Sequence, residues 1–198
     1  MLSPIQPSWV PPNVAFEIDD ASQNWTWPDS TFDFVHIGVL TGCIHDLNHV
    51  YREAYRCLNP GGWIEHQKAS CKWTSDTCGI PPERPIGQAI QLFSEAGKKT
   101  GRTFRVVEDD IQRNGMEQAG FVGLTSKDIK IPLGGWPEDP QEKQLGLLCS
   151  EALLGDIEGQ LANLNCCNVF FDRYMLISVK AIRSMFVRQS MGGLRMKL

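Results

Sequence analysis

The 198 residues are enough for one domain with a sizeable core, and 42% hydrophobic and 21% charged residues are ordinary for a globular protein. A net charge of −4 argues against nucleic acid as a partner, and seven irregularly spaced cysteines do not make a disulfide framework. Because the start is not signal-like and no long apolar run occurs, we expect an intracellular protein of the cytoplasm or nucleus without membrane contact.

Two strands are predicted in the first forty residues. Val14, Phe16 and Ile18 fall at every second position, which predicts a short strand with one buried face. After a polar loop, residues 32–40 (FDFVHIGVL) are almost continuously apolar. Such a run is typical of a strand that helices cover on both faces.

An amphipathic helix is predicted next. Its apolar residues share one stripe at helical spacing: Leu47, Val50, Tyr51, Ala54 and Leu58. Asp46 is placed as the N-cap, and residues 59–62 (NPGG) end the helix, because proline cannot continue it and glycine accepts a left-handed turn. Residues 63–66 (WIEH) then predict a short strand.

Three helices and two strands are predicted in the second half. They are a helix over 85–99, a helix capped by Asp109 or Asp110 that ends at Gly120, a strand over 122–131, a helix that begins at Pro140 and a strand over 173–179. Strands that alternate with helices predict an α/β sheet of mostly parallel strands.

The end of the chain differs from the rest in charge. From Cys166 onward there are six Lys or Arg residues and one acidic residue, a net charge of +5, so the preceding residues carry −9. We interpret residues 166–198 as a divergent basic tail, which is either an ordinary terminus or the product of a retained intron or a shifted frame.

A short acidic motif follows the first predicted strand. In open parallel sheets, ligands bind beyond the carboxyl ends of the strands, where Asp19-Asp20-Ala21 is placed. A carboxylate there can accept a hydrogen bond from an exocyclic amine such as that of adenine, while the next backbone N–H serves a ring nitrogen. Taken alone, these residues favour a solvated acidic turn.

A longer block carries a family resemblance. A strand in P-D-x-x-F-D-x-V, a helix that ends in R-x-L-x-P-G-G and a short strand (within 28–66) resemble the second half of class I S-adenosylmethionine-dependent methyltransferases. LSPIQPSWVPPNVAFEIDDA, LTGCIHD, GGWIEHQ and GMEQAGF resemble the fungal subgroup related to the velvet-associated regulator of secondary metabolism. The resemblance implies a Rossmann-like, mostly parallel α/β sheet. It divides the chain into a partial methyltransferase domain (1–145), a C-terminal helix (146–165) and the tail (166–198).

The resemblance implies S-adenosylmethionine as cofactor and assigns seven residues to its site. They are Leu2 and Ser3 at the adenine face, Asp20 and Ala21 at the adenine edge, and His36, Ile37 and Gly38 near the methionine part. Gly38 departs from the subgroup, where an arginine is common. Methyl transfer depends mainly on holding the nucleophile in line, so no catalytic base is assigned. The acceptor, a small molecule or a protein, and the oligomeric state stay open.

A metal site is the rival interpretation of one motif. His45 and His49 lie four residues apart with Glu53 four further on, which is similar to H-E-x-x-H zinc sites. However, Asp46 stands where the zinc motif has its glutamate. Asp46 is also the predicted N-cap, so His45 lies before the start of the helix. We predict no metal.

The family's first βαβ unit has no counterpart in this sequence. Class I methyltransferases begin with a strand, a glycine-rich loop and a second strand whose acid binds the ribose hydroxyls. The glycine pairs here, at 61–62, 134–135 and 192–193, lie elsewhere, and Met1 occupies the slot of the ribose acid. We therefore expect an N-terminally truncated domain.

Two hypotheses remain. Either the chain represents a cofactor-dependent methyltransferase, or it is a non-catalytic methyltransferase-like binding module or degenerate fragment. The sequence upstream of the Met1 codon would separate them. The chain alone is expected not to bind S-adenosylmethionine measurably, and saturable binding at micromolar concentrations would contradict this.

Overall fold

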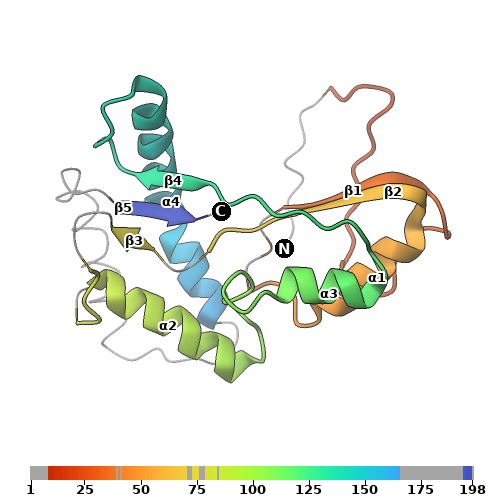
Figure 1. The fold of residues 1–198 in the computed structure, drawn as a ribbon, viewed down its shortest axis with the longest axis horizontal. Coiled ribbons are helices and arrows are strands. Elements are labelled where there is room, and N and C mark those ends of the chain that lie inside the picture. The colour runs from red at the N-terminus through yellow and green to blue at the C-terminus, as the bar shows by residue number, and fades with distance from the viewer. Residues whose placement is uncertain are drawn as a thin grey trace.

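The computed structural model describes residues 9–38, 40, 42–70, 73–75, 79–83, 85–165 and 194–197. Their helices and strands form two groups (Figure 1). One group is a pair of parallel strands with two short helices, and the other is a three-stranded antiparallel sheet with two longer helices. Helices and strands are mixed along the chain, which is the α/β organisation that the sequence predicts.

The parallel pair is built from adjacent segments of the chain. β1 (Phe32–Gly38) pairs with β2 (Leu58–Gln67), and α1 (Leu47–Cys57) connects them. α3 (Ile111–Ala119) lies beside α1, on the same side of the two strands (Figure 1). The core lies between this face of the strands and the two helices, and its buried residues are Ile37, Ile44, Leu47, Val50, Tyr51, Val106 and Met116.

α1 forms as the sequence predicts. The Asp46 side chain accepts a hydrogen bond from the backbone N–H of His49 at 3.0 Å, which satisfies one of the free amides of the first turn. The predicted apolar stripe is buried. The helix ends at Cys57 and β2 begins at Leu58. Residues 59–62 lie within β2 at a register irregularity with β1, and Gly61 there has a positive φ of 84°.

The second group contains the remaining elements. They are β3 (Thr74–Ser75), α2 (Pro85–Thr100), β4 (Lys130–Leu133), α4 (Pro140–Asn165) and β5 (Leu194–Lys197). β5 lies between β3 and β4 and is antiparallel to both. The three predicted helices are confirmed, and the expected domain boundary at residues 145–146 falls inside α4.

Two expectations about individual strands are wrong. Val14, Phe16 and Ile18 form no strand and are 43%, 58% and 75% exposed, because no neighbouring strand pairs with them in the described chain. Only the last residues of the strand predicted over 122–131 lie in a strand, at the start of β4. Pairing in the described sheets is parallel for β1–β2 alone. The strand predicted over 173–179 lies outside the described residues.

β1 is covered on one face only, which corrects the expectation of two covered faces. Ile37 is buried on the helix side, whereas Phe34 is 55% exposed on the other. Phe34 pairs in register with Trp63 of β2, which is 73% exposed. α1 and α3 both lie on the opposite side, so this face is open in the described structure (Figure 1).

Candidate functional site

The predicted site residues that the structure describes lie near one edge of the parallel pair. β1 and β2 end together, with Gly38 opposite Gln67 and Ile37 opposite His66. The chain leaves this edge and enters the first turn of α1. There the ring of His49 lies 3.1 Å from the carbonyl oxygen of Gln23, which accepts its hydrogen bond.

The Asp20–Ala21 turn is therefore held at the carboxyl edge. Ala21 packs against the core cluster that contains Ile37. Gln23, two residues further on, is bound to the first turn of α1. Ala21 and Ile37 thus belong to one packed region of the core. Open parallel sheets bind their ligands at the carboxyl ends of their strands, and β1 ends at Gly38.

The Asp20 carboxylate is exposed and organised by its own turn. Its Oδ1 atom accepts the backbone N–H of Ser22 at 3.0 Å, and its carbonyl oxygen accepts the N–H of Gln23 at 2.9 Å. The hydrogen bond from the Ser22 backbone lowers the pKa of Asp20 below its ordinary value. The group is therefore an anion near neutral pH that can accept hydrogen bonds from an amine.

The remaining predicted residues have different positions. His36 lies on the open face, where its Nδ1 atom is 2.8 Å from Oε2 of Glu65, whereas Ile37 points into the core. A methyl group added at Gly38 would lie 3.4 Å from the His36 ring, which is ordinary contact. Leu2 and Ser3 lie outside the described residues.

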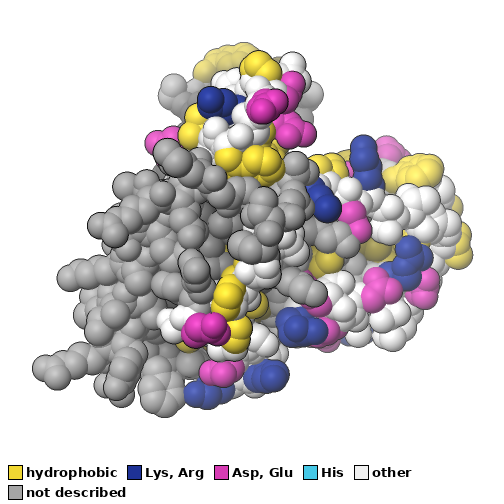
Figure 2. All heavy atoms as spheres, turned by 60° about the vertical axis from the view of Figure 1, so that its left-hand side comes forward, with side chains coloured by type: hydrophobic (Ala, Val, Ile, Leu, Met, Phe, Trp, Pro, Cys, Tyr) yellow, Lys and Arg dark blue, Asp and Glu magenta, His cyan; other side chains and the backbone are white. Residues whose placement is uncertain are grey.

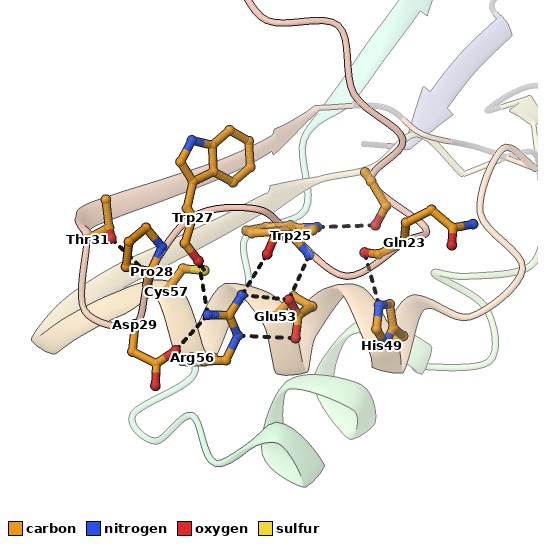
Figure 3. A network of polar contacts seen from close by, with 11 residues as sticks. Gln23, Trp25, Trp27, Pro28, Asp29, Thr31, His49, Glu53, Arg56 and Cys57 are labelled. Atoms are coloured by element: carbon orange, nitrogen blue, oxygen red, sulfur yellow. Dashed lines mark hydrogen bonds and ion pairs between the residues drawn. The ribbon is translucent and has the colours of Figure 1, made fainter.

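A polar stripe on α1 holds the loop that follows the turn (Figure 3). His49, Glu53 and Arg56 fall at i, i+4 and i+7, so they share one side of the helix. Their hydrogen-bond partners are mainly backbone groups of residues 23–29. We call these contacts the α1–loop network; its members are Gln23, Trp25, Trp27, Asp29, His49, Glu53 and Arg56.

Arg56 makes most of the network's bonds. Its guanidinium donates to the carbonyl oxygens of Trp25 at 3.1 Å and Trp27 at 3.0 Å, and to the carboxylate of Asp29 at 2.6 Å. It also donates to both oxygens of Glu53, at 2.8 and 3.3 Å. This two-point contact with Arg56 lowers the pKa of Glu53, and the two acids raise that of Arg56.

A second pair lies behind the carboxyl edge, on the core side. The Tyr51 hydroxyl, which is fully buried, is 2.7 Å from Nδ1 of His66 at the end of β2. The other ring nitrogen of His66 is buried and has no hydrogen-bond partner in the described part of the chain. Burial lowers the pKa of His66 to about 4, helped by the nearby Lys68, and it raises the pKa of Tyr51.

The residues of the rival metal motif have other partners. His49 and Glu53 bind the loop, Asp46 caps α1, and the His45 ring accepts a hydrogen bond from Arg102 at 2.8 Å. Among the residues described, no group of three His, Cys, Asp or Glu could hold a metal ion.

Sequence reasoning missed both the α1–loop network and the Tyr51–His66 pair. The spacing of His49, Glu53 and Arg56 was a usable signal, because three polar residues on one helix side opposite an apolar stripe can bind a neighbouring segment. No comparable signal marked the Tyr51–His66 pair, since it depends on how β2 lies against α1.

The described surface mixes both signs of charge. On the face shown in Figure 2, basic and acidic side chains lie interspersed. Ion pairs among the described residues include Arg105 with Asp109 at 2.9 Å. No helix in the described ranges has the length and apolar character needed to cross a membrane.

Comparisons with known proteins converge on one family. The methyltransferase domain family matches residues 1–97. Methyltransferase pytC of Aspergillus terreus is 34% identical over 163 residues, which are 82% of this chain and 49% of that protein. Secondary metabolism regulator LAE1 of Cochliobolus heterostrophus is 29% identical over 145 residues, which are 72% of this chain and 46% of that protein. Secondary metabolism regulator laeA of Aspergillus fumigatus is 27% identical over 158 residues, or 79% and 42% of the two chains.

The chain spans about half the length of the relatives it matches. Among solved structures, phospholethanolamine N-methyltransferase 2 of Haemonchus contortus, in complex with phosphomonomethylethanolamine and S-adenosylhomocysteine, covers 90% of this chain and 35% of its own. Its sequence identity of 16% and TM-score of 0.43 are too low for a comparison of sites.

Proposed function

We propose that this chain serves in S-adenosylmethionine-dependent methyl transfer. The methyltransferase domain family matches its residues 1–97, and its relatives include a fungal methyltransferase and fungal secondary-metabolism regulators. The observation that carries this proposal is the position of the Asp20–Ala21 turn. Ala21 packs against the core cluster that contains Ile37, and Gln23, two residues further on, is bound to His49 in the first turn of α1, which follows β1 in the chain. The methyl acceptor is a small molecule or a protein.

The residues at this edge fit the adenine end of the cofactor. Asp20 presents an exposed carboxylate whose pKa is lowered, so it is charged near neutral pH and can accept the exocyclic amine of adenine. The backbone N–H of Ala21 serves a ring nitrogen. His36, Ile37 and Gly38 lie further along the same edge, toward the methionine part. Leu2 and Ser3, which are not described, belong to the proposed adenine contacts.

The role of these residues is to position the cofactor. When bound, S-adenosylmethionine supplies a methyl group on a positively charged sulfur. The chain's residues fix the adenine at one end, which sets the distance and direction of the sulfur relative to the acceptor. This task needs no proton transfer by Asp20, and we assign no catalytic base.

A titration of the 198-residue chain tests the proposal. The adenine-edge contacts are few, so, in line with the expected lack of binding at micromolar concentrations, the dissociation constant should lie in the millimolar range. Amide NMR shifts are sensitive to such weak binding. S-adenosylhomocysteine should shift the amides of Asp20, Ala21 and Gly38. In Asp20→Ala these shifts should disappear, because losing a charge-assisted hydrogen bond weakens binding about tenfold to a hundredfold.

Asp19→Ala is the matched control. Asp19 is the neighbouring carboxylate, and its Oδ1 atom accepts only the N–H of Asp20 among the hydrogen bonds described for it, at 2.8 Å. We expect this variant to keep the wild-type shifts. Equal shifts in wild type and Asp20→Ala, or shifts only at other parts of the chain, would contradict the proposed site. The alternative, a methyltransferase-like binding module, would bind no adenine at this edge.

A further inference from the structure

The adenine-binding turn is fixed from one side only. The segment before it, Val14–Ile18, is exposed and pairs with no strand in the described structure. Nothing described upstream can therefore hold Asp20 in place against the sheet. The contacts that set the position of the turn come from Ala21 and from the residues after it.

Trp25 is the link between the turn and the helix. Its indole N–H donates to the carbonyl oxygen of Ala21 at 3.3 Å, inside the turn. Its own backbone is bound at both polar groups: the N–H donates to Oε2 of Glu53 at 2.9 Å, and the carbonyl oxygen accepts from Arg56 at 3.1 Å. Figure 3 shows Trp25 between the turn and these two side chains.

The two helix residues are themselves fixed. The carboxylate of Glu53 is only 13% exposed and shares two hydrogen bonds with Arg56. Both belong to α1, whose opposite side is packed in the core. A rigid helix thus determines where the Trp25 backbone lies, and the Trp25 side chain transmits that position to Ala21.

We propose that Trp25 is a positioning residue for the adenine-binding turn, and that Glu53 and Arg56 act through it. The inference rests on the proposed function, because the turn is useful only if it binds the cofactor. None of the three side chains needs to touch the cofactor. Their effect is to restrict the turn before binding, which reduces the ordering cost when the ligand binds.

Hydrogen exchange of the ligand-free chain tests the first half of the inference. Trp25→Phe removes the indole N–H but keeps an aromatic ring. We expect the amides of Ser22 and Gln23, which are bound to Asp20, to exchange about three- to tenfold faster. The amide of Ala54 in α1 should be unaffected. Trp63→Phe is the matched control, since Trp63 lies exposed on β2, outside the α1–loop network; it should leave Ser22 and Gln23 within twofold of wild type.

Titration with S-adenosylhomocysteine tests the second half. The dissociation constant measured at the Asp20 and Ala21 amides should rise about three- to tenfold in Trp25→Phe and stay unchanged in Trp63→Phe. If Trp25→Phe also loses protection at Ala54, Trp25 is replaced by benzothienylalanine, which keeps the size of the indole and lacks its N–H.

The outcomes separate the two proposals. Unchanged exchange at Ser22 and Gln23 would overturn the role of Trp25, whatever the ligand does. Faster exchange with an unchanged dissociation constant would overturn it as well, because the position of the turn would not matter for binding. A wild-type chain whose turn ignores S-adenosylhomocysteine would overturn the proposed function, and with it the adenine role of Trp25. The exchange result would still report whether Trp25 holds the turn.

Discussion

Two histidines of this chain, His49 and His66, have different roles. His49 is held at the helix surface and binds a loop carbonyl, and nothing about it requires burial. His66 is placed behind the strand ends, where Tyr51 meets one ring nitrogen and the other has no partner in the described structure. Burial of a group that prefers to be charged below neutral pH makes the stability of the fold depend on pH.

We expect His66 to destabilise the fold as the pH falls. Its pKa in the folded chain is about 4, below the ordinary 6.5, so the unfolded chain binds the proton more readily. The contribution of neutral His66 to the free energy of unfolding is fully present above pH 6.5 and is lost as the pH falls toward 4. Between pH 7 and 4.5, the free energy of unfolding should fall by about 2–3 kcal/mol more in wild type than in His66→Asn. Urea unfolding at both pH values measures this; equal losses in the two proteins would contradict it.

At the scale of elements, local signals predicted helices well and strands poorly. α1 could be predicted because its cap and its apolar stripe lie in one stretch of sequence. Val14–Ile18 has a strand pattern but no partner in the described residues, and β1 is apolar yet covered on one face. Whether a strand forms and which face is buried depend on distant segments, which a local pattern does not contain.

The open face of β1–β2 gives a test at this scale. Adjacent exposed aromatics on a sheet face promote self-association, so Trp63→Lys should shift the chain toward monomer in sedimentation velocity. Its free energy of unfolding should change by less than about 0.5 kcal/mol. Ile64→Lys is the control, because Ile64 is one residue further along and packs against the core; it should cost about 2–4 kcal/mol. Unchanged association in Trp63→Lys would contradict the account of this face.

At the scale of the whole molecule, the site combines residues that are far apart in the chain. The family resemblance predicts that Asp20 and Gly38 lie close together at the carboxyl edge, and this stays a prediction. Trp25, Glu53 and Arg56 could not be predicted as neighbours, since their bonds join a loop to a helix 28 to 31 residues later. The tail shows the same limit: its four described residues form β5 between β3 and β4, and no sequence pattern indicated that pairing.

A comparison of two ligands tests the central claim, that the Asp20–Ala21 turn reads adenine. S-inosylhomocysteine differs from S-adenosylhomocysteine in the base: a carbonyl replaces the exocyclic amine, and the neighbouring ring nitrogen carries a proton. Both contacts assigned to the turn are thereby reversed, because Asp20 would face an acceptor and the Ala21 N–H would face a donor. We predict that S-adenosylhomocysteine shifts the amides of Asp20 and Ala21 and that S-inosylhomocysteine, at the same millimolar concentration, does not. Equal shifts with both ligands would show that the turn does not recognise adenine.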